Sequence, residues 1–583
     1  MTPPRTDPVG FELFKNALCS IADEMALTIF RTAYSGVLKD VMDYSTAFCD
    51  GAGRIVAQGL TQPAHLFAFP EALQATLDRY GDRMRPGDVY CLNDPYEGGM
   101  HLPDVFVLKP IFYRGERLGF AATVCHHTDV GGRVAGSNAA DSTEIYAEGL
   151  RLPPVPLYVA GEPNVTLFAL IEKNVRVPVR VVGDLRAQLA ACHIAEQAFL
   201  GLVERYGVET VKAHMQELMD YTERLTRAAI GELPDGEWSF EDWIDDDGID
   251  RGQPIPLRVT IRKRGDRLVA DWTGSSPQVK GAINSTLSFT KAATFTCVKS
   301  VLAAEIPNNE GFFRVIEVIA PPGTITNCVL PAACAARGLT GFRMVDTCFG
   351  ALAQMLPDRV PAASDGGATG VSIGGYHADR TPFIQVDFLM SAWGARPWAD
   401  GLDGNAHIFG NLSSQPAEVC ETEHPVEILC FEFIQDAGGP GKYRGGMSLR
   451  RDYRLVEAEA TLQVRADRRA FRPYGLQGGR PGRASQNFLI TPEGETRLLP
   501  AKVTMTMKRG EVFRHEQAGP GGWGDPLERD PERVLRDVRN ELVSLAAARD
   551  DYGVVIDPAV WRVDLAATRA RRGGLKIWGP GPG

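Results

Sequence analysis

Histidines and carboxylates stand close together in residues 93–127, which read NDPYEGGMHLPDVFVLKPIFYRGERLGFAATVCHH. His101 and Asp104 are three residues apart, and His126 follows at the end of an apolar run. Imidazole nitrogen and carboxylate oxygen together suit zinc, manganese or iron, and a catalytic site keeps one coordination position open for water. Together with Asp43, these residues predict a site for one divalent transition metal, with zinc or manganese favoured.

A metal at such a site would lower the pKa of its bound water from 15.7 toward about 7 and so provide hydroxide near neutral pH. Asp129, in HTDVGG, and Glu144, in STEIYAEG, are the residues predicted to orient this water or to take its proton. A turn aspartate and a surface glutamate are the alternative interpretations of these two residues.

Two further polar residues of this stretch are predicted to support the fold and not to bind a metal. Asp94 lies in Asn93-Asp94-Pro95, a pattern typical of a capped turn. His127 directly follows His126, and side chains alternate between the two faces of a strand, so only one of the two histidines can face the site. We assign His126 to the site and His127 to the core.

The elements that must hold these residues are turns and strands. Pro103, with Gly98 and Gly99 before it, argues against a helix interior, so His101 and Asp104 are predicted on a structured loop. The apolar run 118–125 predicts a buried strand that ends at the histidine pair. Asp43 lies near the start of a predicted β-hairpin that turns around Asp50-Gly51 and Gly53.

Helical periodicity marks three long segments. Residues from about 9 to 35 predict one long helix with a single buried stripe. Its apolar positions are Phe11, Phe14, Leu18, Ile21, Met25 and Ile29. Residues 165–230 predict two helices separated at Gly207, which we expect to form an antiparallel pair over a sheet. His193 and His214 on these helices are interpreted as surface or packing residues.

The middle of the chain combines strands with acidic turns. Residues 232–252 interleave Trp238, Phe240 and Trp243 with carboxylates, which favours an ordered strand and loop over a linker. The acidic run 245–247 is either a solvated face or a cation site. Residues 255–276 predict a hairpin that turns at Gly265-Asp266.

Glycine-rich runs mark the last third, at residues 438–446, 475–482 and 519–526. None of them matches the glycine pattern of a P-loop or of a dinucleotide-binding loop, so tight turns in a β-rich body are predicted. A helix near 529–549 and a mobile Gly/Arg/Pro tail are expected to close the chain.

These elements predict a mixed α+β fold, with a multi-layered β-rich body, a long N-terminal helix and an inserted helical pair. Five regions are expected along the chain. They are residues 1–164 with the N-terminal helix and the β-rich metal site, 165–230 helical, 231–430 mixed α/β, 431–527 glycine-rich β, and 528–583 with a C-terminal helix and flexible tail.

Composition narrows the class of partner. The 583 residues carry a net charge of −11, which offers no basic field for nucleic acid, so a small molecule or another protein is expected. Eleven cysteines occur without a CxxC pair and are predicted to be reduced and mostly buried. The sequence contains neither a membrane-spanning apolar run nor a signal segment, so we expect a cytoplasmic protein.

Several ordered motifs carry a family resemblance over nearly the whole chain. They are MDYSTAFCDGAGRIVAQG, residues 93–132, EIYAEGLRLPPVPLY, DWTGSSPQVKGAIN, IPNNEGFFR, GGPGKYRGG, PYGLQGG and GPGGWGDP. In these motifs the chain resembles the B subunit of the hydantoinase, N-methylhydantoinase and 5-oxoprolinase family. The caprolactamase B subunit and the larger subunits of acetone and acetophenone carboxylases belong to the same family.

The resemblance implies a separate hydantoinase A-type subunit that uses ATP to phosphorylate the oxygen of a cyclic amide, within a hetero-oligomer. Metal-bound hydroxide in the B subunit would then attack the activated carbon of a hydantoin, 5-oxoproline or another lactam. Carried over residue by residue, the family's metal ligands fall on Asp43, His101, Asp104 and His126.

Two alternatives remain open at this point. The chain could be a subunit of an ATP-dependent ketone carboxylase that uses the same site. It could also have lost its chemistry and serve as a scaffold for its partner. The residues alone do not select among these three functions.

Overall fold

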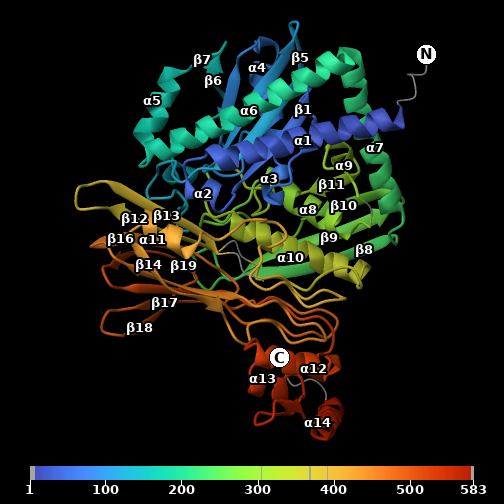
Figure 1. Ribbon diagram of the computed structural model, residues 1–583, viewed down its shortest axis with the longest axis vertical. Helices are drawn as coiled ribbons and strands as arrows, with labels where there is room; N and C mark the ends of the chain where they lie inside the picture. Colours follow the sequence, from blue (N-terminus) through green and yellow to red (C-terminus); the bar gives the residue numbers. More distant parts are fainter. Residues whose placement is uncertain (1–6, 304, 367–368, 390–391, 579–583) are drawn as a thin grey trace.

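The computed structural model describes residues 7–303, 305–366, 369–389 and 392–578 (Figure 1). Within these ranges, helices and mainly antiparallel strands share the chain. The strands form one seven-stranded sheet, two four-stranded sheets, one five-stranded sheet and one two-stranded sheet. The predicted mixed α+β class with several β layers is confirmed.

The seven-stranded sheet, of order β2-β1-β5-β4-β3-β6-β7, positions the predicted ligands. β4 (Asp104–Tyr113) and β5 (Glu116–His126) form a long antiparallel hairpin in which Asp104 is paired with His126. β1 (Tyr44–Asp50) lies along the other edge of β5. Residues 43, 104 and 126 therefore meet at one end of three neighbouring strands. The remaining strands are β2 (Ile55–Gln58), β3 (Val89–Leu92), β6 (Val155–Val159) and β7 (Glu162–Pro163).

Two long helices, α1 (Pro8–Thr32) and α6 (Pro178–Tyr206), lie side by side across this sheet (Figure 1). The predicted stripe of α1 is buried, apart from Phe11, which is half-buried. Asp7 caps α1 by accepting from the N–H groups of Val9 and Gly10. The shorter helices around the sheet are α2 (Gly36–Lys39), α3 (Pro63–Leu66), α4 (Phe69–Tyr80) and α5 (Val165–Asn174).

The third long helix, α7 (Val208–Gly231), corrects one prediction. It begins after Gly207 as expected, but it turns away from α6 and reaches α9 (Glu310–Phe313), where Asn309 donates to the Thr222 hydroxyl. The helix that accompanies α6 over the sheet is α1, so the predicted pairing of α6 with α7 is wrong. Periodicity locates an apolar face, whereas distant parts of the chain decide what covers it.

The two histidines on these helices are a surface residue and a packing residue, as predicted. His193 is exposed on α6. His214, on α7, packs against the rings of Phe11 and Phe14. Both therefore stay outside the candidate site.

A second layer follows in residues 236–355. Its sheet has the order β11-β10-β9-β8, and α8 (Leu287–Val301) and α10 (Gly338–Met355) pack together beside it. The predicted hairpin at Gly265-Asp266 is confirmed. In the acidic run, Asp245 and Asp247 accept hydrogen bonds from backbone N–H groups and so support loops. The strands are β8 (Gly236–Ile244), β9 (Ile255–Arg264), β10 (Arg267–Asp271) and β11 (Ile316–Ile319).

Two further sheets share one apolar core between them. Their orders are β13-β12-β16-β19 and β14-β15-β20-β17-β18. The first comprises β12 (Thr369–Tyr376), β13 (Pro382–Leu389), β16 (Glu459–Arg465) and β19 (Lys502–Lys508). The second comprises β14 (Val426–Phe433), β15 (Leu449–Leu455), β17 (Gln486–Ile490), β18 (Thr496–Leu499) and β20 (Val512–Glu516), with α11 (Ala417–Glu423) before β14.

The three glycine-rich runs form one structure, which we call the glycine cluster: residues 438–446, 475–482 and 519–526. Backbone hydrogen bonds join the runs, from Gly439 N–H to the Pro520 carbonyl and from Leu476 N–H to the Gly522 carbonyl. A methyl group on Gly519 would collide with the carbonyl of Ala437. Glycine is therefore required here for the close approach of main chains, beyond the tight turns that were predicted.

The C-terminal part differs from the prediction in two ways. The expected single helix is divided into α12 (Pro531–Arg539) and α13 (Leu545–Asp550), with Glu541 at a φ of 60° between them. The expected mobile tail instead contains β21 (Ile556–Asp557), β22 (Arg562–Val563) and α14 (Leu565–Trp578), while its last five residues lie outside the described ranges.

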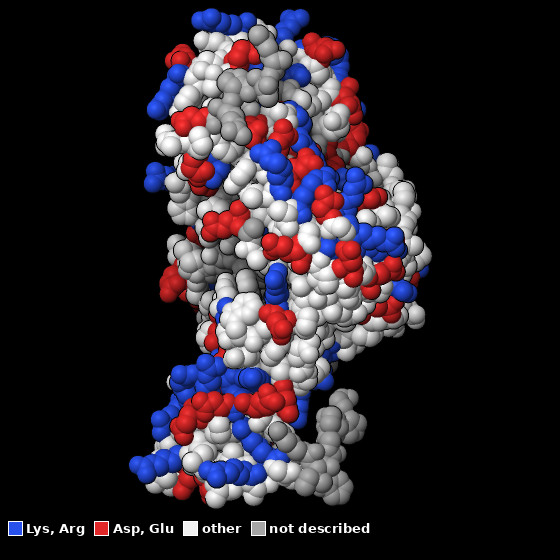
Figure 2. Space-filling model, turned by 90° about the vertical axis from the view of Figure 1, so that its right-hand side faces the viewer, with Lys and Arg blue, Asp and Glu red and all other residues white. Residues whose placement is uncertain are grey.

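The surface mixes both signs of charge. Figure 2 shows acidic and basic side chains interleaved over one face, including a row of acidic residues flanked by basic ones on the C-terminal helical part. None of the helices that the structure describes combines the length and the apolar character needed to cross a lipid bilayer.

Candidate metal centre

Strand register brings the predicted ligands to one place. Asp104 is the first residue of β4 and lies opposite His126, the last residue of β5. Asp43 directly precedes β1, and its backbone carbonyl accepts a hydrogen bond from the N–H of His126 at 3.0 Å. His101 lies in the turn before β4, as the glycines and proline around it predict. All four side chains are buried.

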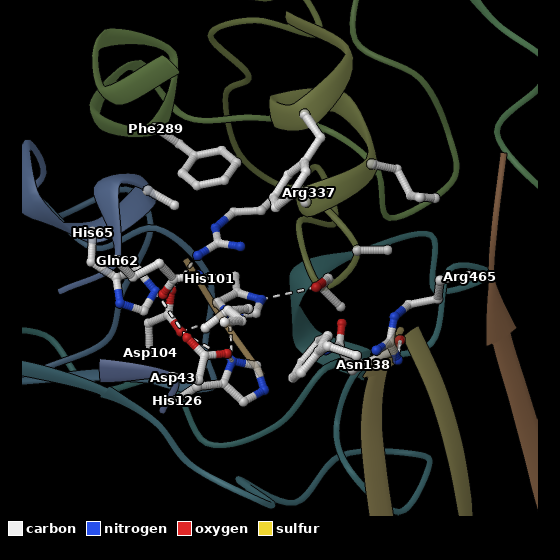
Figure 3. A pocket seen from close by; sticks show the side chains of 18 residues that line it. Asp43, Gln62, His65, His101, Asp104, His126, Asn138, Phe289, Arg337 and Arg465 are labelled. Atoms are coloured by element: carbon white, nitrogen blue, oxygen red, sulfur yellow. Dashed lines mark hydrogen bonds and ion pairs between the residues drawn. The ribbon is translucent and has the colours of Figure 1, made fainter. Parts of the chain in front are cut away.

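Three ligand-type atoms converge closely (Figure 3). The Nε2 atom of His101 lies 2.9 Å from Asp104 Oδ1, and Nδ1 of His126 lies 3.1 Å from the same oxygen. The two histidine nitrogens are 3.2 Å apart. Tetrahedral ligands with bonds of about 2.1 Å stand roughly 3.4 Å from one another, so this spacing is close to that around a zinc-sized ion.

The orientation of His101 also suits a ligand. Its Nδ1 atom lies 2.8 Å from the backbone carbonyl of Ala335. A carbonyl can only accept, so Nδ1 carries the proton and Nε2 presents its lone pair toward Asp104 and His126. A carbonyl behind a histidine is the usual support of a metal-binding imidazole.

Asp43 completes the predicted set from the other side. Its Oδ2 atom lies 3.8 Å from His126 Nδ1. Its Oδ1 atom has no hydrogen-bond partner among the described residues. An unpaired carboxylate oxygen beside two histidines suits a further ligand to the predicted metal ion.

The structure adds two residues that sequence reasoning missed. His65, on α3, places Nε2 3.5 Å from Asp104 and 3.6 Å from Asp43. Arg337, before α10, pairs directly with Asp104. Neither has a spacing relative to the other ligands that a pattern could detect, although His65 follows the predicted hairpin within a few residues.

Burial and charge set the protonation of the group. Burial lowers the pKa of His65, and it lowers the pKa of His101 to about 3, so both imidazoles are neutral at pH 7. Burial acts to raise the pKa of Asp104, but the charged groups around it, among them the Arg337 guanidinium, outweigh burial and hold that pKa well below its usual range. Neutral histidines around an ionised carboxylate are the protonation states in which these residues bind a divalent cation.

The cavity at this site has a volume of about 40 Å³. Seven buried polar atoms of its lining have no hydrogen-bond partner among the described residues. Because buried polar atoms are nearly always paired, these atoms are available to bind water or a ligand in the cavity. The atoms are Asp43 Oδ1, Gln62 Oε1, His65 Nδ1, His126 Nε2, Asn138 Oδ1, Arg337 Nε and Arg465 Nη2.

The two residues predicted to handle the proton of water lie elsewhere. Asp129 is buried, and its carboxylate accepts from the backbone N–H and the guanidinium of Arg176 at 2.7 and 2.9 Å. Glu144 is exposed. Neither lines the cavity, so the predicted catalytic roles of Asp129 and Glu144 do not fit their positions.

The structural interpretations of the neighbouring residues agree with the structure. Asp94 accepts a hydrogen bond from the N–H of Tyr96 and caps the turn. His127 faces away from the cavity, with Nε2 3.1 Å from Gln188 on α6. Strand alternation thus separates the two adjacent histidines as predicted.

A buried glutamate supports the loop behind His101. Glu148 accepts hydrogen bonds from the N–H groups of Cys334 and Ala335, both at 2.8 Å, and Ala335 is the residue whose carbonyl holds His101. Burial raises the pKa of Glu148 to about 8, which favours the protonated carboxyl at pH 7. Sequence reasoning did not identify this support.

Glu148→Gln tests the protonation of this carboxyl. A raised pKa means that the acid form stabilises the fold fully below the ordinary value of 4.5 and that this contribution is lost as the pH rises toward about 8. Glutamine stays neutral and keeps an oxygen for both N–H groups. As the pH rises from about 5 to 8.5, the unaltered chain should therefore lose unfolding free energy that the variant keeps. We expect this to give the variant an advantage of about 1 kcal/mol or more at the upper end of the range.

Urea unfolding at several pH values measures this difference. Glu144→Gln, which changes an exposed glutamate four residues away, is the matched control and should follow the unaltered chain. If Glu148→Gln also follows the unaltered chain at every pH, Glu148 is ionised in the fold and the assignment is wrong.

Comparison with known proteins identifies relatives of this chain. The family model described as Hydantoinase B/oxoprolinase matches residues 7–526. The caprolactamase beta chain of Pseudomonas jessenii is 33% identical over 97% of this chain and 99% of its own length. A provisionally named D-/L-hydantoinase B chain of a Pseudomonas species is 31% identical over 95% of this chain and 96% of its own.

Solved structures agree with these sequence matches. ATP-dependent caprolactamase from Pseudomonas jessenii superimposes with a TM-score of 0.92 at 32% identity, over 98% of this chain and 100% of that one. A nucleotide-free acetone carboxylase chain superimposes with a TM-score of 0.91 over 99% of this chain and 84% of its own, at 18% identity, and shares the fold. The chain therefore belongs to the hydantoinase B/oxoprolinase family.

Proposed function

We propose that this chain is the metal-bearing B subunit of an ATP-dependent cyclic amide hydrolase that acts on a hydantoin, 5-oxoproline or another lactam. The observation that carries the proposal is the convergence of His101 Nε2, His126 Nδ1 and Asp104 Oδ1 within 3.2 Å of one another in a buried cavity. The names of the relatives, one from a caprolactamase and one from a hydantoinase, supply the substrate class.

The protein's own side chains have separate tasks in this proposal. His101, Asp104 and His126 would hold one zinc or manganese ion, with Asp43 beside them. When bound, such an ion lowers the pKa of coordinated water and supplies a nucleophile at neutral pH. His65 contacts both carboxylates and positions them. Arg337 pairs with Asp104 and holds it from a different element.

Activation of the amide is assigned to another chain. An unstrained amide is a poor electrophile, so phosphorylation of its oxygen would make the carbon easier to attack. The sequence contains no P-loop pattern, and the glycine-rich runs pack against one another rather than opening helices. A hydantoinase A-type subunit that uses ATP would therefore complete the enzyme as a hetero-oligomer in the cytoplasm.

A ketone carboxylase subunit is the second candidate. The acetone carboxylase chain has the same fold, but at 18% identity this likeness concerns the fold alone. The 33% and 31% identity over nearly full length to the caprolactamase and hydantoinase chains favours the cyclic amide hydrolase. A scaffold without chemistry is the third candidate, and the buried, unpaired ligand atoms argue against it.

Co-expression with an A-type subunit tests the proposal. The purified complex is screened for ATP hydrolysis with lactams, hydantoins and ketones, each with and without bicarbonate, and its metal content is measured. We expect about one transition metal per chain and ATP consumption that depends on a cyclic amide and not on bicarbonate. Bicarbonate-dependent turnover of a ketone would select the carboxylase. A metal-free complex without substrate-dependent turnover would select the scaffold.

A further inference from the structure

The cavity contains one buried arginine, Arg465, to which the proposed function gives no role. Arg465 is the last residue of β16 and is 2% exposed. Its Nη1 atom donates to the carbonyl of Asn138 at 2.8 Å and lies 3.4 Å from the Ser372 hydroxyl. Its Nη2 atom has no hydrogen-bond partner among the described residues. In the view of Figure 3, Arg465 stands across the cavity from the histidine and aspartate ligands.

Arg465 lacks the counterion that comparable arginines have. The buried residues Arg343, Arg451 and Arg468 each pair with an aspartate. No ion pair involves Arg465 in the part of the chain that the structure describes. An unpaired buried charge is costly, so such a guanidinium is typical of a site that receives an anion.

The neighbouring strand makes room for this guanidinium. Gly370 on β12 is paired with Arg465 across the sheet, and a methyl group on Gly370 would collide with the Nη2 atom. The ring of Phe388 contacts His126, with 5.3 Å between ring centroids, and its centroid lies 5.8 Å from Arg465 Cζ. Arg465 and His126 therefore both lie close to the same aromatic ring.

The charges of the cavity favour an anionic ligand. Two carboxylates, Asp43 and Asp104, face two guanidinium groups, Arg337 and Arg465. A divalent cation adds two positive charges to this balance, so the loaded cavity is positive overall. A neutral cyclic amide would leave that charge unmatched, whereas a phosphorylated one would neutralise it.

We propose that Arg465 binds the phosphoryl group of the activated substrate and so positions its carbon beside the metal ligands. This inference rests on the proposed function. Guanidinium groups donate to phosphate oxygens through parallel N–H groups, and the unpaired Nη2 offers such a donor. A carboxylate on the substrate has the same anion chemistry, and the experiment below separates these two ligands.

Calorimetry on the metal-loaded chain, with inorganic phosphate and acetate as probes, tests the inference. We expect Arg465→Gln to weaken phosphate binding at least about tenfold, and Arg465→Lys, which keeps the charge, to weaken it less. Arg472→Gln removes an exposed arginine and is the matched control, which should bind phosphate like the unaltered chain. The metal content should be the same in all four proteins.

Three outcomes would overturn the inference. They are the absence of phosphate binding by the unaltered chain, an equal affinity of Arg465→Gln for phosphate, and Arg465-dependent binding that prefers acetate. If Arg465→Gln does not fold, Arg465→Lys and the rise in melting temperature with added phosphate decide instead. A chain that holds no metal contradicts the proposed function, and that result is read separately from phosphate affinity.

Discussion

The His101→Ala variant is expected to lose both its metal and its turnover in the complex with the A-type subunit. Nε2 of His101 lies within 3.2 Å of both Asp104 Oδ1 and His126 Nδ1, so its removal opens the centre of the ligand group. Changes to residues that merely support ligands cost about 10- to 100-fold in metal affinity or activity, and the loss of a ligand should exceed this.

Metal analysis and substrate-dependent ATP hydrolysis measure the two losses. His193→Ala is the matched control, because it removes an exposed histidine of α6 and should keep both metal and turnover. Thermal unfolding verifies that each variant is folded. Full turnover by His101→Ala with no metal present would refute the proposed function.

Gly519→Ala is expected to cause the largest loss of stability among the substitutions considered. The added methyl group would meet the backbone carbonyl of Ala437, which is itself fixed by the N–H of Arg483, next to the glycine cluster. Main chain cannot move aside as a flexible side chain can, so we expect a loss of about 3 kcal/mol or more in unfolding free energy. Urea unfolding measures it, and failure to accumulate as soluble protein agrees with it.

Gly201→Ala is the control substitution, and it is expected to raise stability where Gly519→Ala lowers it. Gly201 lies in the exposed part of α6, and a methyl group there would meet no atom within 4 Å. Alanine is favoured over glycine in a helix by up to about 1 kcal/mol, so this variant should be more stable than the unaltered chain. If the two alanine variants lose stability equally, close backbone packing does not explain the glycines of the cluster.

Local patterns predicted those parts of the site that depend on neighbouring residues. Strand alternation separated His126 from His127, and the glycines and Pro103 placed His101 in a turn. The same reasoning found the hairpin that carries Asp43 and the apolar stripe of α1. The assignment of a metal to these residues stays a prediction, which His101→Ala tests.

The remaining parts depend on which distant segments meet. His65, Arg337 and Arg465 reach the cavity from α3, from the start of α10 and from β16, and no spacing along the sequence connects them. The contact of Asp129 with Arg176 could not be predicted for the same reason, because the two residues are 47 positions apart in the sequence. The pairing of α6 with α1 likewise follows from contacts between distant parts of the chain.

The glycine cluster also constrains when the protein can fold during its synthesis. Its first run ends at residue 446, but the hydrogen bonds that fix that run come partly from residues 519–526. Until these residues leave the ribosome, the shared core of the last two large sheets, including the strand that carries Arg465, cannot close fully. Pairing between such distant segments is slow and leaves strand edges open to association. We therefore expect the nascent chain to need protection from aggregation until its third glycine-rich run has been synthesised.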